Sequence, residues 1–451
     1  MSNNHSDTIT SVVTATGAGV GIIRLSGPEA LIIAKKITNK SLKPRYAHYL
    51  PFYDQNQQIL DQGICIYFPG PHSLTGEDVI ELQGHGGSII LDMLLKLTLE
   101  LGARQARAGE YLERAFLNDK IDLAQAEATA DLIEATTAQA ALSAVRSLSG
   151  EFSKQINDLL HSLIHLRMYV ESSIDFPEEE IDFLSDGIVE NKTKKIIEQL
   201  ENILSIAQQG VLLKEGISFA IIGQPNAGKS SLLNKLSGEE TAIVTDIAGT
   251  TRDIVKQEIN LDGLPLHLID TAGLRESDCE VEKIGIERAW KAVENVDHVF
   301  MLIDSNKGFD QQDKIILEQL NQHTNKITIV FNKIDLLNQK ANIEENKANT
   351  EVYLSIKKNQ GIDLLKDHLK KVIGYQNQTE GIFSARRRHI EALEQALEST
   401  KKGLEQLLIY QAGELLAEEL SIAQQFLSEI TGEFTSDDLL GKIFSDFCIG
   451  K

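Results

Sequence analysis

The sequence predicts an α/β plus α fold, in which a doubly wound α/β unit lies between two stretches of helix. Buried strands alternate with helices after Ile217, which is typical of a parallel sheet covered on both faces. A glycine-rich motif joins the first of these strands to its helix. Segments rich in Ala, Leu, Glu and Gln, with apolar residues at helical spacing, precede and follow this unit. The 451 residues suffice for two or three domains.

Composition indicates a globular protein of a reducing compartment, which we expect to be the cytoplasm. Hydrophobic residues make up 42% and charged residues 24% of the chain, without an apolar run of about 18 residues or a signal-peptide pattern. Cys65, Cys279 and Cys448 are far apart, which argues against a zinc site or a disulfide framework. The net charge of −22 would repel a polyanion, so contact with RNA would need a local basic patch or a partner protein.

Residues 1–118 are predicted to form a mixed α/β domain. Short apolar runs at Val20–Leu25 and Ile64–Phe68 indicate strands, and 78–82 indicates another that ends in a turn at 84–87. Helical spacing of apolar residues follows through 88–101.

Residues 119–215 and 379–451 are predicted to be two parts of one helical domain, into which the α/β domain, 216–378, is inserted. After Phe383, helices are expected at 390–408, 414–430 and 437–447. The two helical parts have similar composition, and insertion is feasible because domain termini often lie close together. The basic run 386–389 is interpreted as a solvated helix start.

The segment Gly223–Ser230, GQPNAGKS, matches the phosphate-binding loop GxxxxGK[ST]. It follows the apolar strand 219–222 and opens a helix, which is the context that the motif requires. Its glycines allow backbone N–H groups to approach phosphate oxygens, and the helix N-terminus favours an anion. Lys229 would reach the outer phosphates, and the Ser230 hydroxyl would bind magnesium.

Three further motifs in the expected order predict a guanine-nucleotide site. Asp270–Gly273 ends a strand, where Asp270 can reach the magnesium shell and Gly273 can face the γ-phosphate. Asn332–Asp335 ends another, and a carboxylate there can accept hydrogen bonds from the ring N–H and amine of guanine, which adenine lacks. Ser355–Lys357 is a weaker version of the loop behind the base.

The residue after Gly273 is Leu274, which cannot orient the attacking water as a glutamine does in related enzymes. Glu282 is a candidate for this role, although a solvated loop charge is the simpler interpretation of that residue alone.

Two other patterns resemble known motifs but do not fit them. The glycines of 17–21 precede a strand, unlike a dinucleotide fingerprint, and residues 448–451 match a prenylation box poorly.

With these motifs the chain resembles the MnmE (TrmE) family of tRNA modification GTPases. The resemblance runs from about residue 8 to the end of the chain. The stretches that carry it are GQPNAGKSSLLN, TDIAGTTRD at 245–253, DTAGLRE at 270–276, GIERAW at 285–290, FLNDKIDLAQAEA at 116–128, LTGEDVIELQGHGG at 74–87 and the terminal FCIGK.

The resemblance implies an N-terminal folate-binding domain, a helical domain and a Ras-like G domain inserted into the latter. It also implies a homodimer formed through the N-terminal domains, which acts with the FAD-dependent partner MnmG in a heterotetramer or larger complex. Together they would add a carboxymethylaminomethyl or aminomethyl group to the 5-position of the wobble uridine of certain tRNAs. The carbon would come from 5-formyl- or 5,10-methylene-tetrahydrofolate. No membrane contact is implied.

The resemblance also assigns individual residues. Glu282 would orient the catalytic water, Ser230 and Thr251 would bind magnesium, and potassium would be bound by Asn226, Thr245, Ile247 and Thr250. The folate positions would be Arg24, Glu81, Lys120 and Lys451. The implied GTP-binding residues are Asn226, Ala227, Gly228, Lys229, Ser230, Ser231, Thr245, Asp246, Ile247, Ala248, Gly249, Thr250, Thr251, Asp270, Thr271, Ala272, Gly273, Asn332, Lys333, Asp335 and Ser355.

Alternatives remain at this point. The G motifs would also serve a ribosome-assembly or signalling switch, and the GTPase could merely regulate a folate-binding module. Arg252 could act as an arginine finger in place of potassium. Cys448 could be a nucleophile, although a buried thiol suits the apolar tail better.

Overall fold

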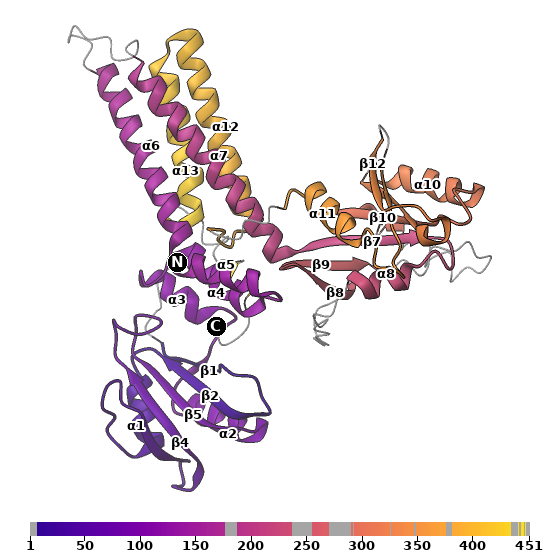
Figure 1. Cartoon of the computed structure of the whole chain (residues 1–451). Helices are drawn as coiled ribbons and strands as arrows, with labels where there is room; N and C mark the ends of the chain where they lie inside the picture. Colours follow the sequence, from indigo (N-terminus) through magenta and orange to yellow (C-terminus); the bar gives the residue numbers. More distant parts are fainter. Residues whose placement is uncertain are drawn as a thin grey trace. The chain divides into compact units, whose positions relative to one another are not determined.

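The computed structural model (Figure 1) describes residues 7–175, 187–236, 255–269, 290–291, 293–324, 326–346, 349–375, 381–433, 441, 443–445 and 447. The chain divides into two compact units. One is built from described residues within 7–130, 147–200 and 391–447, and the other from those within 131–146 and 201–390. None of the described helices is long and apolar enough to cross a membrane.

A six-stranded sheet dominates the N-terminal part of the first unit (Figure 1). The strands lie in the order β3-β4-β5-β2-β1-β6, and all described pairings are antiparallel except β1–β6. Apolar side chains on one face pack with α1 and α2 into a core. The elements are β1 Ile9–Val12, β2 Ala18–Ser26, α1 Ala30–Thr38, β3 His48–Tyr53, β4 Ile59–Phe68, β5 Val79–Gly86, α2 Ser88–Glu100 and β6 Arg104–Gln105.

The predicted turn at 84–87 is wrong for its first three residues, because β5 continues to Gly86. The glycines of this segment allow neighbouring strands to approach closely and do not reverse the chain direction. A Cβ on Gly84 would lie 2.3 Å from Asp61 Oδ2, and one on Gly86 would lie 2.2 Å from the carbonyl oxygen of Ala18. The helix predicted directly after this segment is confirmed as α2.

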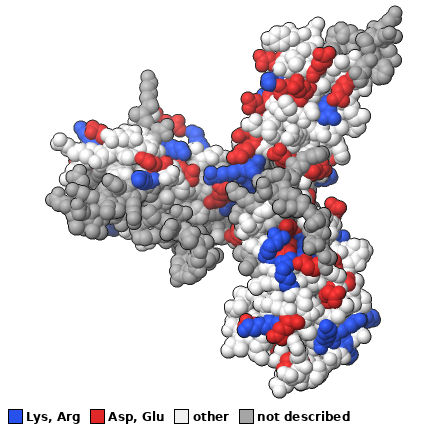
Figure 2. Space-filling view, turned by 180° about the vertical axis from the view of Figure 1, so that it is seen from behind, with Lys and Arg blue, Asp and Glu red and all other residues white. Residues whose placement is uncertain are grey.

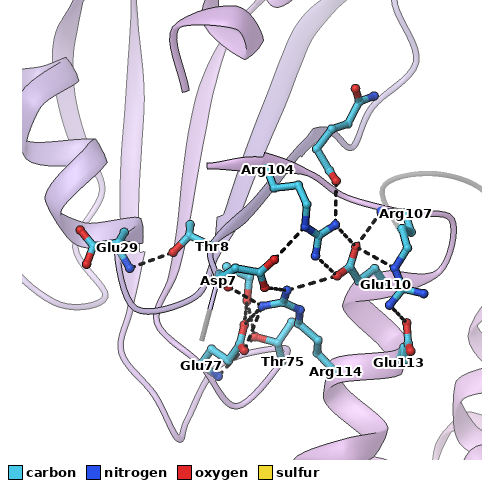
Figure 3. A network of polar contacts seen from close by, with 12 residues as sticks. Asp7, Thr8, Glu29, Thr75, Glu77, Arg104, Arg107, Glu110, Glu113 and Arg114 are labelled. Atoms are coloured by element: carbon cyan, nitrogen blue, oxygen red, sulfur yellow. Dashed lines mark hydrogen bonds and ion pairs between the residues drawn. The ribbon is translucent and has the colours of Figure 1, made fainter. Parts of the chain in front are cut away.

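A partly buried ion network ties the segment before β1 to α3, Glu110–Leu117 (Figure 3). The Arg114 guanidinium is buried and lies 2.7 Å from Asp7 Oδ1, 3.1 Å from Glu77 and 3.1 Å from Glu110. Burial disfavours the charged form of Glu110, but its bonds to Arg104 and Arg107 outweigh this and hold the pKa of that carboxyl below its usual value. The network therefore depends on ionised partners that satisfy one another.

Helices account for the rest of the first unit, as the composition predicts, and two of them, α5 and α7, lie largely or partly in the second unit. α6 and α13 pack along each other, and their side chains are joined by a 2.6 Å hydrogen bond from Arg167 to Gln424. The predicted helices at 390–408 and 414–430 are confirmed, with slightly wider bounds, as α12 and α13. The helices are α4 Leu123–Glu134, α5 Ala138–Leu148, α6 Glu151–Asp175, α7 Ile188–Glu215, α12 Arg387–Tyr410 and α13 Gly413–Thr431.

The basic run 386–389, at the start of α12, is only partly solvated, contrary to the interpretation from sequence. Arg387 is exposed, but His389 is buried and Arg386 lies 2.8 Å from the buried Asp131 carboxylate. A buried carboxylate needs such a partner, which pattern alone does not reveal. The helix expected at 437–447 lies largely outside the described residues. Of that stretch, Phe444 and Phe447 pack in a cluster with Leu112 and Leu123.

The second unit contains a seven-stranded sheet in the order β12-β13-β11-β10-β7-β9-β8. Its five central strands are parallel, as predicted, but β8 and β12 pair antiparallel at the two edges. The β8–β9 reversal follows from Asp262 and Gly263, both with positive φ, at 52° and 94°. The elements are β7 Ile217–Gly223, α8 Lys229–Leu236, β8 Val255–Leu261, β9 Leu264–Ile269, β10 His298–Asp304, α10 Gln311–His323, β11 Ile327–Asn332, β12 Asn342–Glu345, β13 Thr350–Tyr353 and α11 Ile362–Val372.

Candidate nucleotide site

The glycine-rich loop leaves the carboxyl end of β7, and α8 begins at Lys229, as predicted. Three of its residues have positive φ: Gly223 at 152°, Asn226 at 65° and Gly228 at 111°. A Cβ on Gly223 would lie 2.2 Å from the carbonyl oxygen of Leu302, and one on Gly228 would lie 2.4 Å from Asn332 Nδ2. Glycine is therefore required at both positions by conformation and by space.

The Lys229 ammonium lies within this loop, where it donates to the carbonyl oxygens of Gly223 at 2.6 Å and Gln224 at 3.0 Å. Ser230 and Ser231 follow in the first turn of α8. N–H groups of a first helical turn have no partner within the helix, so this end of α8 presents donors and positive dipole to an anion.

Asn332, at the end of β11, joins the glycine-rich loop to the loop after β13. Its side-chain amide donates to the carbonyl oxygen of Ala227 at 2.8 Å, and its Oδ1 accepts from the backbone N–H of Ile356 at 3.1 Å. The side chain is buried, so these bonds are protected from water. The Asn332 side chain thus links the two loops, and its amide is engaged in these bonds rather than directed at a ligand.

Asp335 lies in the 3-10 turn η1, Ile334–Leu337, directly after Asn332 and Lys333. The Ser355 hydroxyl donates to Asp335 Oδ1 at 2.6 Å. This bond fixes the partly buried Asp335 carboxylate against the buried Ser355. This leaves further acceptor positions of the carboxylate for a ligand with paired N–H donors.

These loops border a single cavity of about 830 Å³, a size typical of ligand sites. The structure therefore brings together the phosphate-binding loop and the base-selecting motif that the sequence predicts. Lining residues include Asn226, Gly228, Lys229, Ser230, Ser231, Asn332, Lys333, Asp335 and Ser355. Ala227, which belongs to the loop itself, is buried.

Two contacts at this site were not anticipated from sequence. Lys333 forms a 2.6 Å ion pair with Asp304, which ends β10. Gln224 donates to Asp310 at 2.8 Å, and that bond, with the N–H groups of Gln312 and Asp313, lowers the pKa of the Asp310 carboxyl. A polar residue at the end of a buried parallel strand is the signal that could have identified Asp304.

Several predicted site residues lie outside the described residues. They are Thr245, Asp246, Ile247, Ala248, Gly249, Thr250, Thr251, Asp270, Thr271, Ala272, Gly273, Glu282 and Lys451, together with Arg252 and Cys448. Within the described ranges, no group of three or more acidic, His or Cys side chains could hold a metal. The cavity nevertheless offers the Ser230 hydroxyl and the Asn226 amide, neutral oxygen ligands that suit magnesium and potassium respectively.

A second predicted group lies on the N-terminal sheet. Arg24 on β2 pairs with Glu81 on β5, with guanidinium–carboxylate distances of 2.9 and 3.1 Å. Gln83 also donates to Glu81, at 3.0 Å. Tyr111, which the sequence did not single out, lies under the Arg24 guanidinium at 5.5 Å. It donates to the carbonyl oxygen of Arg24 at 2.8 Å, and burial raises the pKa of its phenol to about 12.

Lys120 is exposed and follows α3, where its side chain packs against the turn at Gly76. In the described part of the chain no hydrogen bond or ion pair joins Lys120 to Arg24 or Glu81. The structure therefore brings together two of the four predicted folate positions and leaves Lys120 apart from their ion pair.

The glycine-rich loop with Lys229, the Asn332–Asp335 turn and Ser355 around one cavity define a P-loop GTP-binding protein. Two family models match the chain in agreement with this. The model of the MnmE helical domain matches residues 123–448, and that of the GTP-binding protein TrmE N-terminus matches residues 8–120. The chain belongs to the MnmE family.

Relatives of similar length support this assignment. The chain is 58% identical over 452 residues to the tRNA modification GTPase MnmE of Hydrogenovibrio crunogenus, covering 100% of both chains. It is 57% identical to that of Saccharophagus degradans, again over 100% of both, and 55% identical to that of Proteus mirabilis, over 99% of this chain and 100% of the relative.

Two solved structures are similar to part of the chain. Era of Aquifex aeolicus, bound to GDP and aluminium fluoride, is 24% identical, with 41% of this chain and 66% of that chain covered and a TM-score of 0.27. The G domain of the T. maritima FeoB iron transporter is 23% identical, with coverage of 35% and 98% and a TM-score of 0.25.

Proposed function

We propose that this protein hydrolyses GTP and couples hydrolysis to modification of the wobble uridine of certain tRNAs. In this proposal it is a cytoplasmic homodimer that acts with MnmG. The two proteins add a carboxymethylaminomethyl or aminomethyl group to the 5-position of the base, with a carbon from tetrahydrofolate. Full-length relatives that are named tRNA modification GTPases support the tRNA part.

The Asp335 carboxylate held by Ser355 at 2.6 Å is the observation that supports GTP as the nucleotide. A carboxylate that borders the cavity can accept from both the ring N–H and the exocyclic amine of guanine. Adenine would leave this carboxylate without donors, at a cost of about 1–3 kcal/mol for each unpaired buried group. The phosphates would then lie over the N-terminus of α8 and meet the Lys229 ammonium.

Magnesium bound by Ser230 and Thr251, and potassium bound by Asn226, Thr245, Ile247 and Thr250, belong to the same proposal. The ions would supply positive charge beside the phosphates, where negative charge spreads as the γ-phosphoryl group is transferred. Of these residues, Ser230 and Asn226 border the cavity. We further propose that Glu282 orients the attacking water, since Leu274 lacks a polar group to do so.

The Arg24–Glu81 pair is proposed as the centre of the folate site, with Lys120 and Lys451 binding the carboxylates of the tail. A carboxylate can accept from the amino-pyrimidine edge of a pterin, and cations match the folate glutamate. Phe447, at the last described position of the chain, packs in one cluster with residues of α3 and α4. That packing supports a C-terminus near the N-terminal domain.

The same proposal retains the predicted domain limits. The folate-binding domain is 1–118, the parts of the helical domain are 119–215 and 379–451, and the inserted G domain is 216–378.

Analysis of wobble uridine tests the function directly. Total tRNA from a strain lacking the gene should lack the modified nucleoside, and wild-type protein should restore it. Lys229→Ala should fail to restore it, because the phosphates lose their cation, whereas Lys314→Ala on exposed α10 should succeed. An unchanged nucleoside profile in the deletion strain would refute tRNA modification, and full rescue by Lys229→Ala would refute its coupling to GTP.

A further inference from the structure

The region between Glu29 and Asp54 differs in charge from the rest of the chain. It contains five basic residues, Lys35, Lys36, Lys40, Lys43 and Arg45, and no Asp or Glu, although the whole chain has a net charge of −22. The region covers α1, the following loop and β3, the edge strand of the N-terminal sheet. In the space-filling view, Lys and Arg side chains on the N-terminal domain gather in separate clusters (Figure 2).

All five basic side chains are exposed. Lys36 borders a small pocket that also contains Asp54 and Glu100, so its charge is locally compensated. In the described part of the chain, Lys40 and Lys43 have no carboxylate within ion-pair distance. We name residues 39–49 the basic loop. Because no carboxylate of the described ranges neutralises these two lysines, the loop carries a local positive charge that can attract a polyanion.

Two tyrosines of the basic loop expose their rings to solvent. The exposed fraction is 54% for Tyr46 and 68% for Tyr49. An exposed aromatic ring by itself is common on a protein surface, but two of them beside these lysines form a surface that a planar ligand can use. Cations beside exposed aromatic rings are the combination used by proteins that bind single-stranded nucleic acid, in which phosphates meet the cations and bases stack on the rings.

Hydrogen bonds hold the basic loop in one conformation. The backbone N–H of Lys43 donates to His48 Nε2 at 2.8 Å, and that of Arg45 donates to the carbonyl oxygen of Tyr67 at 2.8 Å. The Tyr46 ring lies 4.8 Å from the His48 ring and 5.8 Å from Lys43 Nζ. A ligand would therefore meet groups that are already ordered, and binding would cost little conformational entropy.

Strand register places Tyr49 on the same face of the sheet as the Arg24–Glu81 pair. Tyr49 pairs with Ile64 on β4, and Ile64 pairs with Gln83 on β5. Gln83 and Glu81 are two residues apart, so their side chains share a face. The neighbours of Tyr49 along β3, His48 and Leu50, point to the opposite face, where Leu50 enters the core. Tyr49 is on β3 and Glu81 is on β5, with β4 between them, so the two strands lie about 10 Å apart.

From these observations we infer that the basic loop binds an unpaired loop of tRNA. The RNA crosses the edge strand β3: Lys40, Lys43 and Arg45 contact phosphates, and a base stacks on Tyr49, whose ring lies on the face opposite to His48 and its neighbours Tyr46 and Lys43. The inference rests on tRNA being the substrate under the proposed function, and it adds the surface that binds it. Stacking at Tyr49 would hold the loop over the sheet face that carries Arg24 and Glu81, within reach of a one-carbon donor there. An acidic peptide would satisfy the cations but has no need of an exposed ring.

Binding of a labelled anticodon stem-loop to the full-length protein, followed by fluorescence anisotropy over a range of salt concentrations, tests this inference. Lys40→Gln with Lys43→Gln removes two phosphate contacts and should lower the slope of log affinity against log salt by about 1.4. The matched control is Lys154→Gln with Lys314→Gln, which removes the same charge from exposed helical positions and should leave the slope unchanged. Arg45 is left intact because its guanidinium also donates to the carbonyl oxygen of His72.

Tyr49→Leu tests stacking separately, since it keeps an apolar side chain and changes no charge. It should weaken binding of the stem-loop about tenfold and leave binding of a fully paired RNA of equal length unchanged. Equal affinities of the wild type, the lysine double variant and Tyr49→Leu for the stem-loop would overturn the inference. So would a change of sedimentation mass in either variant with RNA affinity retained, since the surface would then join two copies of the chain. Failure of the wild type to bind the stem-loop would also overturn the inference, whereas the proposed function would fail only if the wobble-uridine profile of the deletion strain were unchanged.

Discussion

The Ser355 hydroxyl donates a 2.6 Å hydrogen bond to Asp335 Oδ1, although the two residues follow different strands of the sheet. Parallel pairing of β11 with β13 aligns the carboxyl ends of both strands and so makes this contact possible. Ser355 also accepts from the backbone N–H of Lys358 at 3.2 Å, which fixes its hydroxyl. The proposed selection of guanine by Asp335 would thus depend on an ordered neighbour.

Changing Asp335→Asn should abolish selection of guanine. The new amide would face the donors of guanine with a donor of its own, at a cost of about 1–3 kcal/mol for each group left unpaired. GTP affinity should fall at least about tenfold, and xanthosine triphosphate, which presents an acceptor there, should bind in its place. Titration calorimetry with both nucleotides measures this, with Asp363→Asn at an exposed position of α11 as the control. Equal GTP affinity in wild type and Asp335→Asn would show that another group selects the base.

Hydrolysis should depend on potassium. Asn226 has a positive φ of 65° and borders the cavity, where its amide oxygen can face a cation beside the phosphates. A ring of neutral oxygens suits a large, weakly hydrated cation. GTP turnover should therefore be faster in potassium than in sodium at equal ionic strength. Asn226→Ala should remove the difference and leave GTP affinity nearly intact, whereas equal rates of the wild type in both salts would favour Arg252 as the source of charge.

Glu282→Ala should slow hydrolysis without weakening GTP binding. The residue is proposed to act on the attacking water, which contributes to the transition state and not to the ground-state complex. Single-turnover rates should fall about 100-fold, in the range of positioned acid–base groups, with Glu280→Ala as a nearby control. A normal rate in Glu282→Ala would show that the water is oriented by another group.

Glu81→Gln should weaken folate binding and leave GTP binding unchanged. The neutral amide keeps the size of the side chain. It lacks the negative charge of the carboxylate, which pairs with Arg24 at 2.9 Å and is proposed to accept hydrogen bonds from the pterin edge. Loss of one charged hydrogen bond should reduce affinity for 5-formyl-tetrahydrofolate by about ten- to a hundredfold. Fluorescence titration measures this, with Asp92→Asn on exposed α2 as the control. Unchanged folate affinity would place the site elsewhere.

The G domain should lose stability as the pH falls from about 6.5 towards 4. His298 and His368 both hydrogen-bond the Thr328 hydroxyl at 2.8 Å. Burial, reinforced by His368, lowers the pKa of His298 to about 4. Between these pH values the unfolded chain binds a proton that the folded chain does not, so the free energy of unfolding decreases, by up to about 3 kcal/mol.

Urea unfolding followed by fluorescence of Trp290, the sole tryptophan, reports on this domain, because its side chain packs against the core beside β10. His298→Phe should flatten the pH dependence, whereas His85→Gln, at an exposed histidine of the N-terminal sheet, should not. The same slope in wild type and His298→Phe would assign the effect to other groups.

The nucleotide site could be predicted from sequence because its chemistry is local. The residues from Gly223 to Ser230 are consecutive, and their function follows from backbone N–H groups and a helix start that neighbouring residues determine. Asp335 could be placed in the same site because carboxyl ends of parallel strands meet at one edge of a sheet.

Other features depended on contacts between distant segments. The sequence alone did not reveal that Asp304 pairs with Lys333, that the Tyr111 ring lies under the Arg24 guanidinium, or that Asp131 forms an ion pair with Arg386. These partners lie 29, 87 and 255 positions apart, and no periodicity relates residues at such separations.

By itself, then, the sequence determined the class of fold, the P-loop and the type of base selected, all of which follow from short-range patterns. Only the tertiary structure decided that Arg24 pairs with Glu81 and that Tyr49 shares their face of the sheet. The physical reason is strand register. A shift of one residue in any pairing would turn a side chain to the opposite face, and register is set by how the whole core packs.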